Sequence, residues 1–429
     1  MERERWQPFL KRWSEEWIST HDPEKEEPLD EDVIRDAWLG FAPASAEEVA
    51  AAEARLGHSL PPSLREFLLV TNGWRNAGDF IDRLTGAAEL EWLRDTADRD
   101  WIDAYGGYAD KDEEDDGDVL GRSLRISLTG DACVLFLDPN DVDESGEWAA
   151  YELASWSGTG PVRHGSFHDL MYDLYTSFHA LRKPAGQTRD HWDDRVEQAR
   201  LAALAGEIDE PLAVLEEAEG FGRDRARLLR FQMLAMLGNW YTVVMSHIVL
   251  NRDDPAEFLQ DPLFTEELLP LLFTEDRLTH RRERATLQLL MQRGGESMQL
   301  LIAEYQARLR DPGSRLTFGN PEFDTAVHQI IDRLTADPAF RQQGPVTAPR
   351  SSPGIAAGLS FEDVGGVHEA RRRLTDAAWP ELREAIRLWR PVSEDHIAPV
   401  ALFAHPVLAE MITADRGREI LSMRRGDHE

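Results

Sequence analysis

Cysteine and lysine are scarce in this chain. Its 429 residues include one cysteine, Cys133, and only four lysines among 47 basic residues. A single cysteine excludes an intramolecular disulfide framework and a cysteine-based zinc cluster. Cys133 lies in the apolar run ACVLFLD, so we expect it to pack in a buried strand rather than to act as a nucleophile.

Long apolar segments are also missing. No run approaches the roughly 20 apolar residues that span a bilayer. The first residues, MERERWQPFLKRW, lack the apolar core of a secretory signal. We therefore expect a cytoplasmic protein that does not act at a membrane.

Catalytic signatures are absent as well. The sequence contains no H-E-x-x-H, no G-x-S-x-G and no G-x-x-x-x-G-K-[ST] motif. His164 and His168 lie four residues apart, but no third metal ligand is evident beside them. We expect no catalytic residue, no metal and no cofactor, although a site assembled from distant residues stays open.

One segment imitates a calcium loop. Asp141, Asp143, Ser145 and Glu152 occupy positions 1, 3, 5 and 12 of an EF-hand pattern within DVDESGEWAAYE. An EF-hand requires a helix on each side, whereas both flanking segments have the pattern of strands. The favoured interpretation is an acidic hairpin loop, and calcium binding is the weaker alternative.

Acidic residues dominate the charge. The formal net charge is −33, and residues 1–185 alone hold 40 acidic and 18 basic residues. Such a surface repels nucleic acid and anionic membranes and suits a protein partner with a basic face. The densest run is DKDEEDDGD at 110–118. It is either a solvated loop or a patch for a basic partner, formed by Asp112, Glu113, Glu114, Asp115 and Asp116.

The first 75 residues carry strong helix signals. Trp6, Phe9, Leu10, Trp13 and Trp17 have the spacing of an amphipathic helix. A helix pair follows. Ser45 and Glu48 form a capping-box pattern, and Gly57 suits a left-handed cap after the first helix. Pro61 and Pro62 open the second helix, and Asn72-Gly73, two residues suited to a positive φ, end it.

Residues 122–185 change from a helical to a strand period and back. RSLRISL, TGD and ACVLFLD have the pattern of a hairpin, EWAAYELASW that of a third strand, and SFHDLMYDLYTSFHAL that of a helix. This order predicts an α+β domain over residues 1–187 with one antiparallel sheet.

The rest of the chain is predicted to be helical. Residues 188–341 contain two similar segments with Gly206 and Gly238 in matching places, which resemble tetratricopeptide hairpins. A generic helical bundle is the alternative. Residues 342–360, rich in Pro, Gly, Ser and Ala, predict a linker. Residues 361–429 predict a small helical unit, with Pro380 at a helix start.

The helix pair SAEEVAAAEARLGHSLPPSLREFLLVTNGW resembles the signature of the SUKH superfamily (Smi/Knr-type domains), and the resemblance extends over about residues 40–180. Its signature positions, for which we expect a mainly structural role, are Leu56, Gly57, Leu60, Pro61, Phe67, Asn72 and Gly73. Trp74, which follows them, is interpreted either as core or as an anchor for a partner.

The resemblance implies a noncatalytic binding domain. Many bacterial members are immunity proteins that bind a polymorphic toxin, often a nuclease with a basic face, and keep it inactive. We therefore expect an immunity protein that neutralises such a toxin by direct binding. The alternatives are a regulatory scaffold, whose helical region recruits a cellular protein, and an enzyme of an unrecognised class. The identity of the toxin and the oligomeric state do not follow from the sequence.

Overall fold

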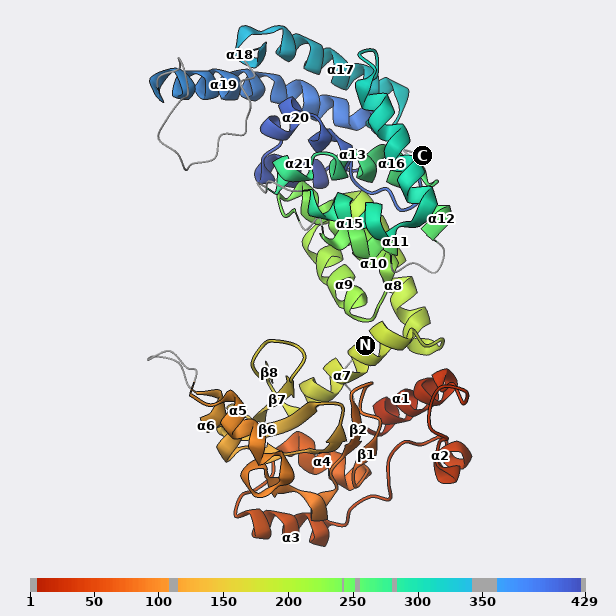
Figure 1. The fold of residues 1–429 in the computed structure, drawn as a ribbon, viewed down its shortest axis with the longest axis vertical. Helices are drawn as coiled ribbons and strands as arrows, with labels where there is room; N and C mark the ends of the chain where they lie inside the picture. The colour runs from red at the N-terminus through yellow and green to blue at the C-terminus, as the bar shows by residue number, and fades with distance from the viewer. Residues whose placement is uncertain are drawn as a thin grey trace. The chain divides into compact units, whose positions relative to one another are not determined.

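The chain forms two compact units in a computed structural model that describes residues 6–107, 115–240, 243–250, 255–279, 284–341 and 361–425. Unit 1 comprises Met1–His191 with Gly220–Gly222, and unit 2 comprises Trp192–Glu219 with Arg223–Glu429. Colours from red to yellow in Figure 1 mark most of unit 1, and colours from yellow-green to blue mark most of unit 2.

Unit 1 is an α+β domain with antiparallel sheets, as the sequence predicts. Its helices are α1 (Trp6–Thr20), α2 (Glu31–Asp36), α3 (Ala46–Leu56), α4 (Pro62–Val70), α5 (Asp100–Tyr105), α6 (Asp116–Arg122) and α7 (Phe167–Arg182), with short 3-10 turns η1 (Ala87–Glu89), η2 (Leu93–Asp95) and η3 (Ala97–Arg99). Its strands are β1 (Trp74–Arg75), β2 (Ile81–Leu84), β3 (Glu91–Trp92), β4 (Leu124–Arg125), β5 (Ser127–Gly130), β6 (Cys133–Val142), β7 (Trp148–Ala154) and β8 (Val162–His164).

The strands form two sheets, so the prediction of one sheet is wrong. One sheet has the order β1-β2-β5 and the other the order β3-β4-β6-β7-β8. The division falls at Ile126, between β4 and β5. Its N–H donates to Leu135 O at 2.9 Å, while its carbonyl accepts from Thr85 N at 2.9 Å. Ile126 thus forms hydrogen bonds toward both sheets, and the chain passes at this residue from the larger sheet to the smaller one.

The larger sheet has a different cover on each face. Leu153 of β7 packs in a core cluster with residues of β6, η2 and α6, namely Leu93, Val119, Leu120, Val134 and Phe136. Successive strand residues alternate between faces, so Glu152 faces the other side. Helix α7 packs on β7 and β8, and α6 packs on β6 (Figure 1).

The N-terminal helix is amphipathic, which confirms the prediction. Its aromatic residues pack against those of α4 and α7: the ring centroids of Trp6 and Phe67 are 5.3 Å apart, and those of Trp17 and Phe178 are 5.0 Å apart. Trp13 is fully buried. Aromatic side chains bury large apolar areas, so this cluster is a principal source of stability for unit 1.

The helix pair begins and ends largely where its punctuation predicts. Ser45 and Glu48 form the capping box, and Gly57 caps α3 with φ of 73°. Helix α4 begins at Pro62 and ends at Val70, before an extended Thr71. The expectation of a positive φ holds for Gly73, at 107°, but is wrong for Asn72. Its side chain instead accepts a hydrogen bond from the N–H of Ala87 at 2.7 Å, which ties the end of α4 to η1.

Unit 2 is helical throughout the part that the structure describes. After α8 (Gln187–Ala205), which begins in unit 1, come α9 (Asp209–Gly220), α10 (Asp224–Met236), α11 (Val243–Leu250), α12 (Pro255–Phe258), η4 (Leu263–Leu268), α13 (Leu269–Leu272), α14 (Glu275–Leu278), α15 (Ala285–Arg293), α16 (Gly295–Arg310), α17 (Pro321–Ala336), α18 (Pro338–Arg341), α19 (Phe361–Ala385), η5 (Ile386–Leu388), η6 (Val400–Ala404), α20 (Pro406–Met411) and α21 (Ala414–Leu421) (Figure 1).

Two sequence features of unit 2 have different outcomes. Gly206 and Gly238 follow α8 and α10 with positive φ of 106° and 83°, as befits turn glycines, while the assignment to tetratricopeptide repeats stays a prediction. Pro380 lies inside α19 and does not begin a helix, so that expectation is wrong. The predicted linker 342–360 lies outside the described residues.

The C-terminal segment is part of unit 2. The amide oxygen of Gln232 on α10 accepts from Ile397 N at 2.9 Å, and Glu267 of η4 accepts from Ala401 N at 2.6 Å. Both acceptor side chains are fully buried. Residues after 361 therefore share a core with the preceding helices, and the domain boundaries suggested by the sequence stay predictions.

Candidate partner-binding site

The loop between α2 and α3 lies beside the C-terminal end of α4. The N–H of Phe41 donates to Thr71 Oγ1 at 2.8 Å, and the N–H of Asn72 donates to Ala42 O at 3.2 Å. These bonds hold residues 38–43 along the segment that follows α4. The signature end of the helix pair therefore positions a second loop, which comes from a different part of the sequence.

Trp38 is the central aromatic residue of this loop. Its ring meets Trp74 edge to face with centroids 5.3 Å apart, and Trp74 beneath it is fully buried. Trp38 itself is only half-buried. Gly40 forms an isolated β-bridge with Trp74, so the loop backbone approaches the core closely. One side of Trp38 is thus supported by the core, and the rest remains accessible.

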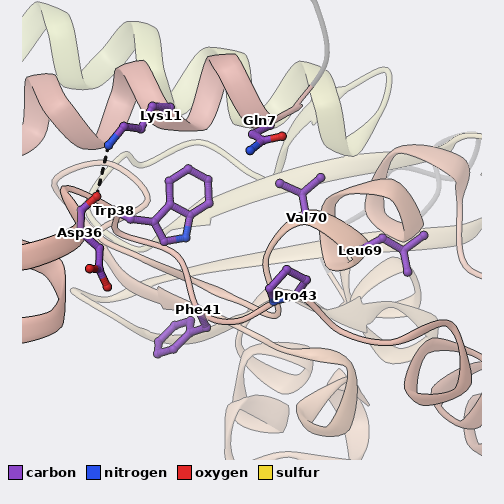
Figure 2. A pocket seen from close by; sticks show the side chains of 8 residues that line it. All are labelled: Gln7, Lys11, Asp36, Trp38, Phe41, Pro43, Leu69 and Val70. Carbon is purple, nitrogen blue, oxygen red and sulfur yellow. Dashed lines mark hydrogen bonds between the residues drawn. The ribbon is translucent and has the colours of Figure 1, made fainter.

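A pocket of about 590 Å³ opens at this loop. Figure 2 shows the side chains that line it, from α1, the end of α2, the loop and the end of α4: Gln7, Lys11, Asp36, Trp38, Phe41, Pro43, Leu69 and Val70. Its volume is in the range of ordinary ligand pockets, and its lining is mainly apolar with a few polar groups at the edge. Such a pocket can accept one or two side chains of a protein partner.

Lys11 closes one end of the pocket. Its Nζ donates to Asp36 O at 3.2 Å and to Ala37 O at 2.9 Å (Figure 2). These bonds satisfy carbonyls at the end of α2, whose cap residue Ala37 has φ of 45°. Lys11 also lies 3.5 Å from Glu15. The ammonium is therefore engaged by the protein's own oxygens, and the pocket edge is not strongly basic.

The margin of the pocket at Asp36 is acidic. Arg35 hydrogen-bonds to the carboxylate of Asp36, which lowers the pKa of that group and keeps it charged. Exposed acidic residues precede it in the segment 22–36, among them Glu24, Glu27 and Glu31. The guanidinium of Arg75 lies 4.0 Å from the centre of the Phe41 ring. It also forms ion pairs with two further carboxylates of this segment, Asp30 at 3.0 Å and Asp32 at 3.2 Å. The site therefore combines an apolar centre with an acidic margin.

The signature residues occupy buried positions or turns. Leu56, Leu60 and Phe67 are buried, Pro61 precedes the first turn of α4, and Gly57 and Gly73 adopt positive φ. Their mainly structural role stays a prediction, with which these positions agree.

Residues 43–180 match the SMI1 / KNR4 family (SUKH-1). The match covers the helix pair, both sheets and most of α7, and it agrees with the resemblance found in the sequence. Searches among curated proteins and among solved structures found no match.

Two predicted partner contacts have different outcomes in this SUKH-1 domain. Trp74 is fully buried, so its interpretation as a partner anchor is wrong and that as core is correct. Trp38 packs on Trp74 and is the accessible aromatic residue of the two. Asp112, Glu113 and Glu114 lie outside the described residues. Asp115 is the N-cap residue of α6, where its carboxylate accepts from Gly117 N at 2.9 Å and from Gly107 N at 2.6 Å. Asp116 is half-buried. A partner role for this run stays a prediction.

The calcium-like segment forms a hairpin turn. Asp143 accepts hydrogen bonds from the N–H groups of Ser145 and Glu147 at 2.8 Å and 2.9 Å, and β6 and β7 pair on either side. Asp141 binds Arg163, which lowers the pKa of its carboxyl. Glu152 lies on β7, in the strand rather than at the end of a loop. These geometries are those of an acidic hairpin and not of an EF-hand.

The pocket residues were missed by the sequence interpretation, although a signal was present. The run AWLGFAPA at 37–44 places two aromatic residues beside a glycine in a loop, where an exposed apolar cluster often marks a binding site.

Among the described residues, no helix is long and apolar enough to cross a membrane.

Proposed function

We propose that this protein is a noncatalytic, cytoplasmic immunity protein whose SUKH-1 domain neutralises a toxin by binding it directly. The family match supports a SUKH-type protein, and the carrying observation is the pocket between α1, the 38–43 loop and α4. It offers half-buried aromatic and aliphatic side chains at the centre of an acidic margin. Interface energy is commonly concentrated in such a centre, where aromatic anchors lose water on binding.

The proposed partner is a toxin domain with a basic face, such as a nuclease. The carboxylates of segment 22–36 would speed its approach and orient it, because complementary fields raise association rates. An arginine or aromatic side chain of the toxin would then enter the pocket beside Trp38 and Phe41. Arg75 and Arg83 already lie over the Phe41 ring. Trp38 is therefore the aromatic residue of the pocket that we expect to attract a cationic group, which favours arginine as the inserted group. Covering the basic face would prevent the toxin from engaging nucleic acid.

The test begins with a search of the neighbouring genes for a toxin domain, and it uses the full chain with the domain so identified. Both are co-expressed in bacteria, and growth rescue and the affinity of the purified pair are measured. Leu69→Arg places a cation at the pocket wall, so we expect loss of rescue and at least about tenfold weaker binding. Leu181→Arg makes the same substitution at a leucine of α7 that is 57% exposed, and it should leave both readouts unchanged. If the parent protein gives no rescue, or if both variants behave alike, the proposal is wrong.

A scaffold role for unit 2 is the second candidate. The family match leaves unit 2 uncovered, and this unit exposes large apolar side chains on α15 and α16: Met291, Leu300 and Leu309. Paired substitutions Leu300→Arg and Leu309→Arg separate the two functions. Under toxin neutralisation they leave rescue intact, whereas under the scaffold function they abolish the cellular phenotype while toxin binding persists.

A further inference from the structure

Three ionisable side chains converge on the α7-facing side of the larger sheet. Glu152 lies on β7, His164 ends β8 and Asp173 lies on α7. In the β7–β8 register Ala150 is opposite His164. Opposite residues share a face, and so do residues two apart on one strand, so Glu152 and His164 point to the same side. Helix α7 crosses that side and brings in Asp173.

The three groups are close enough to share one ion. One ligand atom from each residue, a carboxylate oxygen or a ring nitrogen, lies within 4.8 Å of the others. Around a tetrahedral zinc ion such atoms are about 3.4 Å apart, given bond lengths of about 2.0 to 2.2 Å. Small side-chain rotations cover the difference. The backbone of two paired strands and one packed helix already fixes the three positions.

The Nε2 nitrogen of the His164 ring is buried. It forms no hydrogen bond with any described residue. A buried polar atom without a partner is uncommon and calls for an explanation such as an ion. Burial lowers the pKa of His164, although Asp173 and Asp169 oppose the shift. The imidazole is therefore neutral near pH 7, with a lone pair available.

In the described part of the chain, the two carboxylates also lack a compensating cation. No arginine or lysine among the described residues forms an ion pair with Glu152 or Asp173. Arg163, the neighbour of His164, is opposite Tyr151 in the register and binds Asp141 on the other face. Burial raises the pKa of Glu152, and the charge of Asp173 adds to the increase. Two carboxylates thus face each other beside a neutral imidazole.

Among the described residues, the Cys133 thiol is the other polar group that contacts Glu152. Its Sγ lies 3.6 Å from a carboxylate oxygen of Glu152, toward which it can donate. Burial raises the pKa of Cys133, so the thiol is protonated and acts as a donor. This contact orients Glu152 without neutralising it. Donors to a ligating carboxylate commonly fix its direction in metal sites.

We propose that Glu152, His164 and Asp173 bind one divalent transition-metal ion, for which zinc is the best fit. An imidazole with two carboxylates suits ions of the zinc class, whereas calcium prefers six to eight oxygen ligands. Asp173 is exposed, so a fourth position faces solvent. The ion would join β7, β8 and α7 and thereby stabilise unit 1. This site is separate from the pocket and does not depend on the proposed function.

The test measures zinc binding to the full chain after treatment with a chelator. Titration calorimetry is run with Zn²⁺ in the presence of millimolar Mg²⁺, which occupies weak acidic sites. We expect one saturable zinc site per chain and a rise in unfolding temperature of several degrees at saturation. His164→Gln and Asp173→Asn should each weaken binding about tenfold or more. His58→Gln, at an exposed histidine of the same unit, should leave the affinity unchanged.

Metal-free stability separates a ligand role from a structural one. Asp173→Asn and Glu152→Gln remove a repulsion between like charges, so the chelator-treated variants should unfold at the same or a higher temperature than the parent. Their stabilisation by Zn²⁺ should nevertheless be lost. The proposal is wrong if the parent shows no saturable zinc binding, if His164→Gln binds as tightly as the parent, or if His58→Gln weakens binding equally.

Discussion

Glu16 of α1 lies 3.0 Å from Nε2 of His179 on α7, in the interior of unit 1. The hydroxyl of Tyr175 also donates to Glu16, as does the N–H of Thr188 at 3.2 Å. Neither Glu16 nor Thr188 falls within the matched residues 43–180. The structural domain is therefore larger than the family match, because α1 completes its core from one side and the start of α8 adds a further bond.

Substitution of Glu16 tests this extension. Glu16→Ala leaves His179 and Tyr175 buried without their acceptor, so we expect unfolding by urea to require about 2–4 kcal/mol less free energy. Glu15→Ala is the matched control on the next residue. Its carboxylate is exposed and pairs with Lys11 at the surface, so the change should stay within about 0.5 kcal/mol. Equal effects of the two variants would show that the hydrogen bonds of Glu16 do not contribute to holding α1 on the core.

The same carboxylate makes stability depend on pH. Burial raises the pKa of Glu16, but the hydrogen bonds from His179 and Tyr175 outweigh it, and the pKa is lowered from its ordinary value of 4.5. A lowered carboxyl pKa gives stability that is present above pH 4.5 and is lost as pH falls through the folded value. The difference in unfolding free energy between parent and Glu16→Gln should therefore be constant from pH 7 to 5 and shrink below 4.5. A constant difference down to pH 3 would contradict this.

In unit 2, His405 should produce a second pH dependence. Burial lowers its pKa to about 4, and the nearby charges of Arg277 and His328 add to the effect while Asp332 opposes it. The unfolded chain binds the proton near pH 6.5, so stability should fall as pH drops from 6.5 towards 4, by up to about 1.4 kcal/mol per pH unit. Urea unfolding of His405→Gln should lose this slope.

His247→Gln is the control for that measurement, because His247 is exposed on α11. It should keep the slope of the parent between pH 6.5 and 4. If the slope survives in His405→Gln and is reduced in His247→Gln, the assignment to the buried histidine is wrong.

The features predicted correctly are those encoded within a few residues. Ser45 with Glu48, Gly57 and Pro62 each act on the helix that they begin or end, so their roles follow from the sequence alone. The division into two sheets could not be predicted from the sequence. It depends on the distant strands with which β4 and β5, the strands on either side of Ile126, form pairs. Strand pairing over long separations is decided by packing and not by local pattern.

Neither candidate site could be predicted from local sequence patterns, for the same reason. The pocket needs Lys11, Trp38 and Leu69 from three elements, and the proposed metal site needs the β7–β8 register and the crossing of α7. The sequence suggested Glu152 as the last ligand of a calcium loop and His164 as half of a histidine pair. The structure brings these two residues together with Asp173, which no spacing rule connects to either.

Gly40 offers a final test of how the pocket is held. A Cβ at this position would lie 2.5 Å from Trp38 Nε1 and closer still to Thr71 Oγ1. Gly40→Ala should therefore displace Trp38 and destabilise unit 1 by about 1–3 kcal/mol. Gly121→Ala is the control, since its Cβ would meet only Ile102 Cγ2 at 3.9 Å and alanine favours helix α6. We expect Gly121→Ala to be neutral or stabilising in urea unfolding. Under the proposed function, Gly40→Ala, and not Gly121→Ala, should also weaken binding of the proposed toxin partner at temperatures where both variants remain folded, because only the first moves the aromatic wall of the pocket.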